Sequence, residues 1–185
     1  MNKRERTHEL IKKNTLNILT KKSIYHITIN DICDESSITR STFYTHFKDK
    51  YHVLESINED ICSQLDKHLS IRFDTADIES LLISMINNID KSKFLIMIDI
   101  QEGSVNLRRD IQETVQYSAH KYFKSLSTKQ SCDISIDFMA KLFSSIAIDF
   151  LEHSMMTGET EKNAIFLNNL NRVILNGYFK VIKGE

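Results

Sequence analysis

The chain has 185 residues, with no proline, four glycines and 41% hydrophobic residues, and its 24 Lys/Arg nearly balance 25 Asp/Glu. This length supports one or two domains with a hydrophobic core, so folding does not require disulfides or a structural metal. A charged amino terminus and the absence of an apolar run of roughly 18–20 residues exclude a signal peptide and a membrane span from our expectation, and predict a cytoplasmic protein.

The charge is unevenly distributed along the chain. Residues 1–50 hold ten Lys/Arg against six Asp/Glu, a balance of +4, whereas residues 51–185 hold 14 against 19, a balance of −5. A basic front on an acidic remainder suits a nucleic-acid-binding head, although solvated faces also produce a bias of this size.

Three cysteines, Cys33, Cys62 and Cys132, form neither an even set nor a CxxC pair. This pattern predicts no disulfide framework and no zinc knuckle. We expect all three to be reduced, and mostly buried as small apolar residues.

Helical spacing of apolar residues begins near the amino terminus. Residues 4–22 predict a first helix that ends at two lysines, since cations favour a helix C-terminus. Thr28 then precedes an acidic residue at Asp31, the pattern of an N-cap followed by a favourable first turn. A short second helix over 29–35 is therefore expected.

A serine pair interrupts this helix, and Thr39 offers another N-cap. The sequence predicts a third short helix over 40–47, and a fourth over 49–69 whose apolar residues follow the 3–4 spacing of one buried face. Two short helices around a tight turn are typical of a helix-turn-helix.

Polar breaks divide the remaining chain into further helical segments. We predict helices over 77–89, 92–101, 107–126, 134–156 and 162–182. The fold class is therefore all-α with about nine helices, organised as a three-helix head in domain 1–50 and a helical body in domain 51–185.

Residues 28–54 read TINDICDESSITRSTFYTHFKDKYHVL, and this stretch resembles the DNA-binding head of the TetR/AcrR family of transcriptional regulators. The family pattern is matched in register by Thr28, Ile29, Asp31, Ile32, Ile38, Thr39, Phe43, Tyr44, His46, Phe47, Asp49, Lys50 and Leu54. With the first helix included, the resemblance covers residues 7–57. One departure is Ser37, where glycine or asparagine is usual, and a left-handed serine costs about 1 kcal/mol.

The residues themselves support a DNA-reading helix. Apolar side chains can pack the two short helices together, which leaves polar groups from Arg40 to Thr45 for a major groove. Arg40 suits either bidentate reading of guanine or a phosphate contact.

The resemblance implies more specific roles. Thr28 and Lys50 would hold phosphates, Thr39 would cap the recognition helix, and Tyr44 and His46 would contact backbone or bases. For His46 an equal alternative is packing on the head's core, and for Lys48 it is solvated charge. The expected DNA-binding residues are Thr28, Thr39, Arg40, Ser41, Thr42, Tyr44, Thr45, His46, Lys48 and Lys50.

The resemblance also implies a homodimer on a near-palindromic operator, and a repressor that a small-molecule inducer releases from that operator. The proposed dimer residues are Phe138, Leu142, Ile146, Leu170, Val173, Ile174 and Tyr178. An aromatic and methionine set suits an apolar pocket, namely Phe94, Met97, Ile98, Tyr117, Phe123, Phe138 and Phe143. For both sets the alternative is a place in the core of a monomer.

Other functions were weighed against this one. The chain has no GxSxG, glycine-rich phosphate loop, HExxH or CxxC, so we predict no enzyme, no cofactor and no metal site. A metal-responsive regulator would use His120, Cys132, Asp149 and His153, but nothing fixes their spacing. An interaction protein whose head no longer binds DNA is the remaining alternative.

Overall fold

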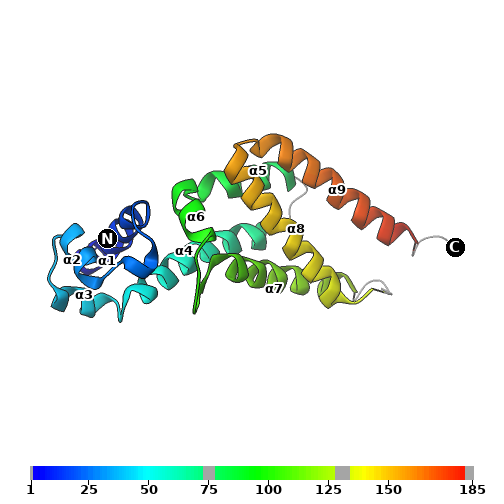
Figure 1. The fold of residues 1–185 in the computed structure, drawn as a ribbon. Coiled ribbons are helices and arrows are strands. Elements are labelled where there is room, and N and C mark those ends of the chain that lie inside the picture. The colour runs from blue at the N-terminus through cyan, green and yellow to red at the C-terminus, as the bar shows by residue number, and fades with distance from the viewer. Residues whose placement is uncertain (1, 73–77, 128–133, 182–185) are drawn as a thin grey trace. The chain divides into compact units, whose positions relative to one another are not determined.

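The computed structural model describes residues 2–72, 78–127 and 134–181. Within these ranges the chain forms nine α-helices, one short 3-10 helix and one two-stranded hairpin, which confirms the predicted all-α class (Figure 1). The elements are α1 (Lys3–Leu19), η1 (Ile24–His26), α2 (Ile29–Glu35), α3 (Arg40–His46), α4 (Lys50–Arg72), α5 (Ile78–Asn88), α6 (Lys91–Ile98), β1 (Gln101–Glu102), β2 (Val105–Asn106), α7 (Leu107–Ser127), α8 (Ile136–Thr157) and α9 (Thr160–Val181).

The helices group into two compact units. The first unit comprises Met1–Ile61 together with Ser92–Leu107, and the second comprises Cys62–Lys91 and Arg108–Glu185. Helix α4 contributes its first half to one unit and its second half to the other. The predicted division into two domains at residue 50 stays a prediction.

The first unit includes α1, α2 and α3, in which α1 packs against α2 and α2 against α3. Its core includes the apolar residues expected to join the two short helices, with Ile32, Phe43 and Phe47 almost fully buried. Helix α4 buries the predicted stripe from Val53 to Ile61. A stripe of this kind forms because residues three and four apart share one helical face.

The turn between α2 and α3 is a Schellman motif. Ser37 has a φ of 51°, its N–H donates to Asp34 O at 3.2 Å, and the Ile38 N–H donates to Cys33 O at 3.0 Å. These two bonds satisfy carbonyls that the end of α2 would otherwise leave unpaired. The left-handed serine expected from the sequence is confirmed.

Two local predictions were wrong. Helix α1 ends at Leu19 with no basic residue in its last turn, and Lys22 instead pairs with Asp31 at 2.8 Å. The predicted helix over 92–101 ends at Ile98, and residues 101–106 form an antiparallel hairpin. Gly103 at its turn has a φ of 57°, a conformation in which a side chain would be strained.

The second unit places α5 against α9 and α8, and α8 against α9. Phe123 of α7 meets Phe143 of α8 edge to face, with ring centroids 5.0 Å apart, inside a small apolar cluster. Gly158, with a φ of 75°, caps the end of α8. No helix of the described ranges is long and apolar enough to cross a membrane.

Candidate nucleic-acid interface

Helix α3 has one buried and one exposed face. Phe43 is fully buried in the first unit, whereas Tyr44 is 49% exposed. Arg40, Ser41 and Thr45 are also exposed. The helix therefore presents a continuous polar surface on a rigid support, as a reading helix in a major groove requires.

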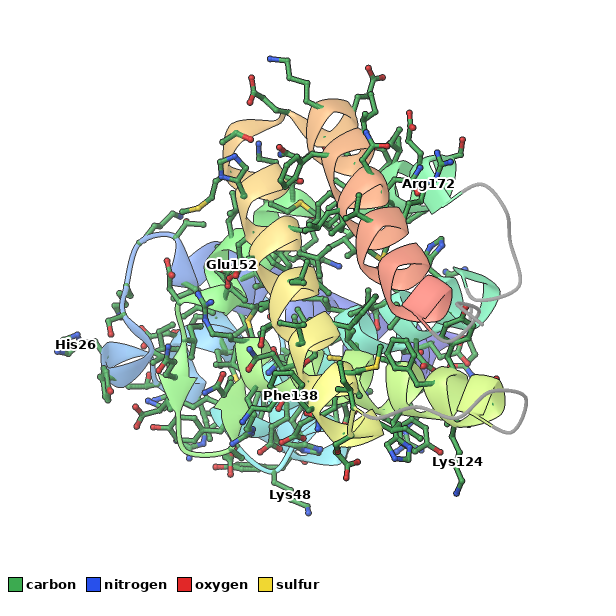
Figure 2. All side chains as sticks on the ribbon, turned by 90° about the vertical axis from the view of Figure 1, so that its right-hand side faces the viewer. His26, Lys48, Lys124, Phe138, Glu152 and Arg172 are labelled. Atoms are coloured by element: carbon green, nitrogen blue, oxygen red, sulfur yellow. The ribbon has the colours of Figure 1, made fainter. Side chains whose placement is uncertain are left out.

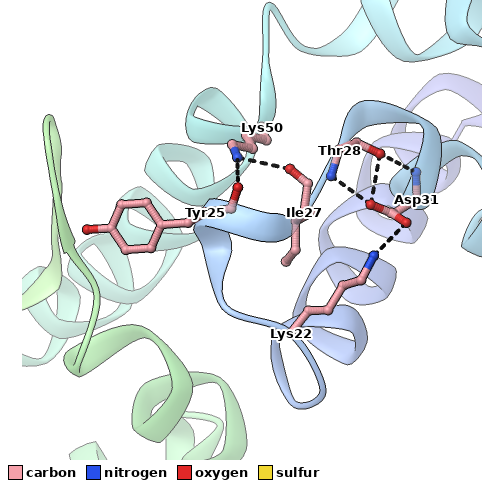
Figure 3. A network of polar contacts seen from close by, with 6 residues as sticks. All are labelled: Lys22, Tyr25, Ile27, Thr28, Asp31 and Lys50. Atoms are coloured by element: carbon pink, nitrogen blue, oxygen red, sulfur yellow. Dashed lines mark hydrogen bonds and ion pairs between the residues drawn. The ribbon is translucent and has the colours of Figure 1, made fainter.

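Both short helices begin with the N-caps that the sequence predicted. The Asp31 N–H donates to Thr28 Oγ1 at 3.1 Å, and the Thr28 N–H donates to the Asp31 carboxylate at 2.7 Å, which together form a capping box (Figure 3). The Thr42 N–H donates to Thr39 Oγ1 at 3.1 Å. Such caps fix the first turn, where further N–H groups remain able to meet a phosphate.

Asp31 is tied to the end of α1 as well. Hydrogen bonding from Lys22 and then from Thr28 holds the pKa of the Asp31 carboxyl well below its usual range. The Thr28 hydroxyl donates to this carboxylate at 2.8 Å, so a phosphate contact through that hydroxyl stays a prediction.

Arg40 is held by neighbours from two helices. Its Nη1 donates to Asn30 Oδ1 of α2 at 3.1 Å, and its Nη2 donates to the Tyr44 hydroxyl at 3.3 Å. The guanidinium carbon lies 5.9 Å from the centre of the Tyr44 ring. Arg40 and Tyr44, two of the predicted contact residues of α3, thus form one group with Asn30 of α2.

Lys50 lies at the start of α4, and its ammonium points toward the 3-10 turn. Figure 3 shows Nζ donating to Ile27 O at 2.9 Å, with Tyr25 O at 3.4 Å. Nζ also donates to Ile24 O at 2.7 Å. An ammonium has three N–H donors, so these carbonyls use its hydrogen-bonding capacity. In this arrangement Lys50 fastens α4 to η1, and a phosphate contact would require it to leave those carbonyls.

His8 and His46 of the first unit lie beside the aromatic ring of Phe47 or of each other. His8 stacks on Phe47 with ring centroids 4.3 Å apart, and His46 lies 5.9 Å from His8. Burial lowers the pKa of both imidazoles, with Lys12 adding to the effect at His8 and Arg4 at His46. His46 is therefore partly buried and lies on α3. Its two predicted roles, DNA contact and packing on the core, both stay predictions.

Lys48 precedes α4 and is exposed. Its backbone N–H donates to His52 Nδ1 at 3.1 Å, and the His52 N–H donates to Asp49 Oδ1 at 2.8 Å. The Asp49 side chain thus caps the first turn of α4, and the His52 side chain accepts from the backbone two residues before that helix. The arrangement leaves the Lys48 side chain on the surface.

The structure brings the ten predicted DNA-binding residues together in the first unit, on the start of α2, on α3 and on the start of α4. Sequence reasoning missed Asn30, an unremarkable polar residue in a short helix. It also missed that Lys12 and Asn14 are buried, which breaks the apolar stripe of α1. Their long-range partners, Asp60 for Lys12 and Glu35 and Ser36 for Asn14, leave no signal in local spacing.

A shared cavity for the seven predicted pocket residues stays a prediction. Phe94, Met97 and Ile98 are buried in the core of the first unit. Phe123 and Phe143 pack against each other in the second unit, where Tyr117 is 66% exposed and Phe138 60% exposed. Helical periodicity alone did not distinguish the buried members of this set from the exposed ones.

The predicted dimer residues lie on α8 and α9 of the second unit. Phe138 and Leu142 are exposed on α8, which faces the viewer in Figure 2, and Val173 of α9 is 71% exposed. Ile146 and Leu170 are half-buried. The side chains of Ile174 and Tyr178 lie outside the described residues.

The four metal-sensing candidates are not seen as one site. His120 Nε2 lies 3.2 Å from Asp137 Oδ1, whereas Asp149 and His153 are exposed on α8. Cys132 lies outside the described residues. Within the described ranges no three His, Cys, Asp or Glu side chains are grouped as metal ligands.

Known proteins resemble this chain in sequence and in fold. No family model matches it. The uncharacterized HTH-type transcriptional regulator YxbF of Bacillus subtilis (strain 168) is 33% identical over 99 residues, a match that covers 49% of this chain and 26% of that protein. The chain thus spans about a quarter of the length of this curated relative.

Solved structures match over nearly the full length. A putative TetR-family transcriptional regulator from Syntrophomonas wolfei has a TM-score of 0.68 at 16% identity, covering 92% of this chain and 95% of that one. A SmeT–triclosan complex has a TM-score of 0.68 at 15% identity, covering 91% of each chain. At these identities the likeness shows the fold.

Proposed function

We propose that this chain, whose fold is that of TetR-family transcriptional regulators, is a sequence-specific DNA-binding regulator that acts in the cytoplasm by binding rather than catalysis. The observation that carries the proposal is the capped helix α3, with Phe43 buried beneath it and Arg40 and Tyr44 exposed together. Polar and cationic groups on an outward helix face match the donor and acceptor pattern of a major groove.

We further propose that the protein acts as a homodimer on a near-palindromic operator. Exposed apolar side chains on α8 and α9 support this proposal, since Phe138, Leu142, Phe166 and Val173 would otherwise remain in water. Two-fold symmetry of the protein would then be mirrored in the operator. Light scattering at micromolar concentration tests the dimer, and a monomeric mass would contradict it.

Repression relieved by a small molecule is the regulation we propose. One structural neighbour is a complex with triclosan, an example of a ligand bound by a protein of this fold. An inducer works by binding one conformation of the regulator better than another, which shifts the population away from the DNA-binding form. The chemical identity of such an inducer for this chain is open to screening once an operator is known.

The testing experiment begins with selection of bound sequences from random double-stranded DNA. Binding of the selected site is then measured by fluorescence anisotropy across a salt series with unrelated competitor DNA. We expect tight binding that survives competitor and weakens steeply with salt. Arg40→Ala and Tyr44→Ala should each weaken binding without unfolding the protein, and an exposed α1 variant, Asn17→Ala, serves as the control.

Enrichment of no sequence, or equal affinity for selected and unrelated DNA, would overturn the proposal. Unchanged binding in both α3 variants would overturn the assignment of α3 as the reading helix.

A further inference from the structure

The guanidinium of Arg40 is positioned before any DNA is bound. It lies at the first residue of α3, yet its Nη1 bonds to Asn30 of α2, and its Nη2 bonds to Tyr44 one turn further along α3. All three side chains are exposed. Because the bond from Arg40 to Asn30 lies on the exposed surface, it adds little to the packing of the core. Its evident effect is to orient the guanidinium.

Positioning matters for arginine because its long side chain loses about 2 kcal/mol of conformational freedom when it is fixed. A guanidinium has five N–H donors, of which these contacts use two. Three donors remain, and a guanine edge needs two of them. The arrangement therefore fixes the orientation of Arg40 without consuming its ability to read a base.

The chemistry of position 30 fits this task. An amide oxygen accepts from the guanidinium, as a carboxylate also would, but it adds no negative charge to a surface that faces phosphates. The amide also carries two N–H donors of its own beside Arg40. Asn30 also differs from Tyr44 in position. The Tyr44 hydroxyl belongs to α3, as Arg40 does, so it cannot set the angle between α2 and the guanidinium.

We propose that Asn30 is a specificity-determining residue of the DNA interface, which orients Arg40 from α2 so that the guanidinium reads one guanine of the operator. The inference rests on the proposed function. It extends base selection beyond the recognition helix to a neighbouring helix, and it makes the effects of Asn30 and Arg40 interdependent.

The test compares wild type, Asn30→Ala, Arg40→Ala and the double variant on the selected operator. A panel of operators with each base pair substituted in turn shows which pair Arg40 reads. Asn30→Ala should weaken operator binding about fivefold or more and flatten the preference at that pair. In the Arg40→Ala background the same change should have an effect of less than about twofold.

Two controls separate orientation from other causes. Asn30→Asp keeps the acceptor, so it should retain the base preference while overall affinity falls through charge repulsion. Thermal unfolding of Asn30→Ala should match wild type, because the contact is exposed. The salt dependence of operator binding by Asn30→Ala should also match wild type, since this variant removes no phosphate contact.

The outcomes distinguish this inference from the proposed function. If wild type selects an operator but Asn30→Ala keeps its full base preference, the role of Asn30 is wrong and the regulator remains. Equal effects of Asn30→Ala with and without Arg40 would also overturn the role. If wild type selects no sequence at all, the proposed function itself fails.

Discussion

Lys12 Nζ of α1 lies 2.5 Å from Asp60 Oδ2 of α4, and this ion pair joins two helices through residues 48 positions apart in sequence. The Lys12 side chain is almost fully buried, whereas Asp60 is about half exposed. Burial lowers the pKa of Lys12, but hydrogen bonds and the negative charges of Asp60 and Glu9 outweigh it, so the pKa lies above its usual range. The lysine therefore stays charged inside the first unit.

Removal of Asp60 should destabilise the protein, because the buried Lys12 ammonium loses a carboxylate partner, although Glu9 remains 2.6 Å away. We expect Asp60→Ala to lower the free energy of unfolding by about 1–3 kcal/mol, less than for a fully buried pair because Asp60 is partly solvated. Lys12→Met in the Asp60→Ala background should recover part of this loss. Urea unfolding of wild type, Asp60→Ala, Lys12→Met and the double variant gives the coupling energy.

The exposed pair Lys162–Glu159 is the matched control for this experiment. Lys162→Met should leave stability nearly unchanged, since surface ion pairs contribute little. An equal loss in Asp60→Ala and Lys162→Met would contradict the role of burial.

Lys50 and Lys48 are close in sequence but have different expected roles. Lys50→Met leaves the carbonyls of Ile24 and Ile27 without their ammonium donor, and should cost about 1–3 kcal/mol of stability. Lys48→Ala should leave stability unchanged and reduce the salt dependence of DNA binding by about one ion. Thermal unfolding and a salt series separate the two roles, and the reverse pattern would reassign the phosphate contact to Lys50.

Ser37 occupies a left-handed conformation that glycine adopts at no steric cost. Ser37→Gly should therefore raise the free energy of unfolding by roughly 0.5–1 kcal/mol, since the relief of strain exceeds the greater freedom of glycine in the unfolded chain. Ser37→Ala, which keeps a β-carbon, should give no gain. Chemical denaturation of the three proteins decides the matter, and equal stability of the glycine and alanine variants would argue against strain at this turn.

His8 should make stability depend on pH near neutrality. Burial, and after it the positive charge of Lys12, lowers the folded-state pKa of His8 below the ordinary 6.5. The imidazole therefore binds a proton more readily in the unfolded chain than in the folded one. This contribution is fully present above pH 6.5 and is lost as the pH falls through the folded pKa. His46, whose pKa is also lowered by burial, acts in the same direction.

The double variant His8→Gln/His46→Gln should therefore show a flatter loss of stability between pH 7 and pH 5.5 than wild type. Melting temperatures measured in matched buffers report the difference. His26, exposed on the 3-10 turn, provides the control variant His26→Gln. A pH profile that is unchanged in the double variant would remove these histidines as the cause.

The sequence alone determined the order of the helices and which face of α3 is exposed. Periodic apolar residues and N-cap residues are local signals, so the nine helices of the described ranges, the caps at Thr28 and Thr39, and the outward polar face of α3 were all predictable. Ser37 was predictable for the same reason, since the turn needs a left-handed residue at one position.

Only the tertiary structure decided the contacts between distant residues. Three of these contacts join residues 10 to 48 positions apart: the ion pair of Lys12 with Asp60, the bond from Lys50 to the 3-10 turn, and the bond from Arg40 to Asn30. It also separated the predicted pocket residues into buried and exposed sets. Local spacing fixes which way a side chain points from its own helix, but the partner it meets depends on how the helices pack.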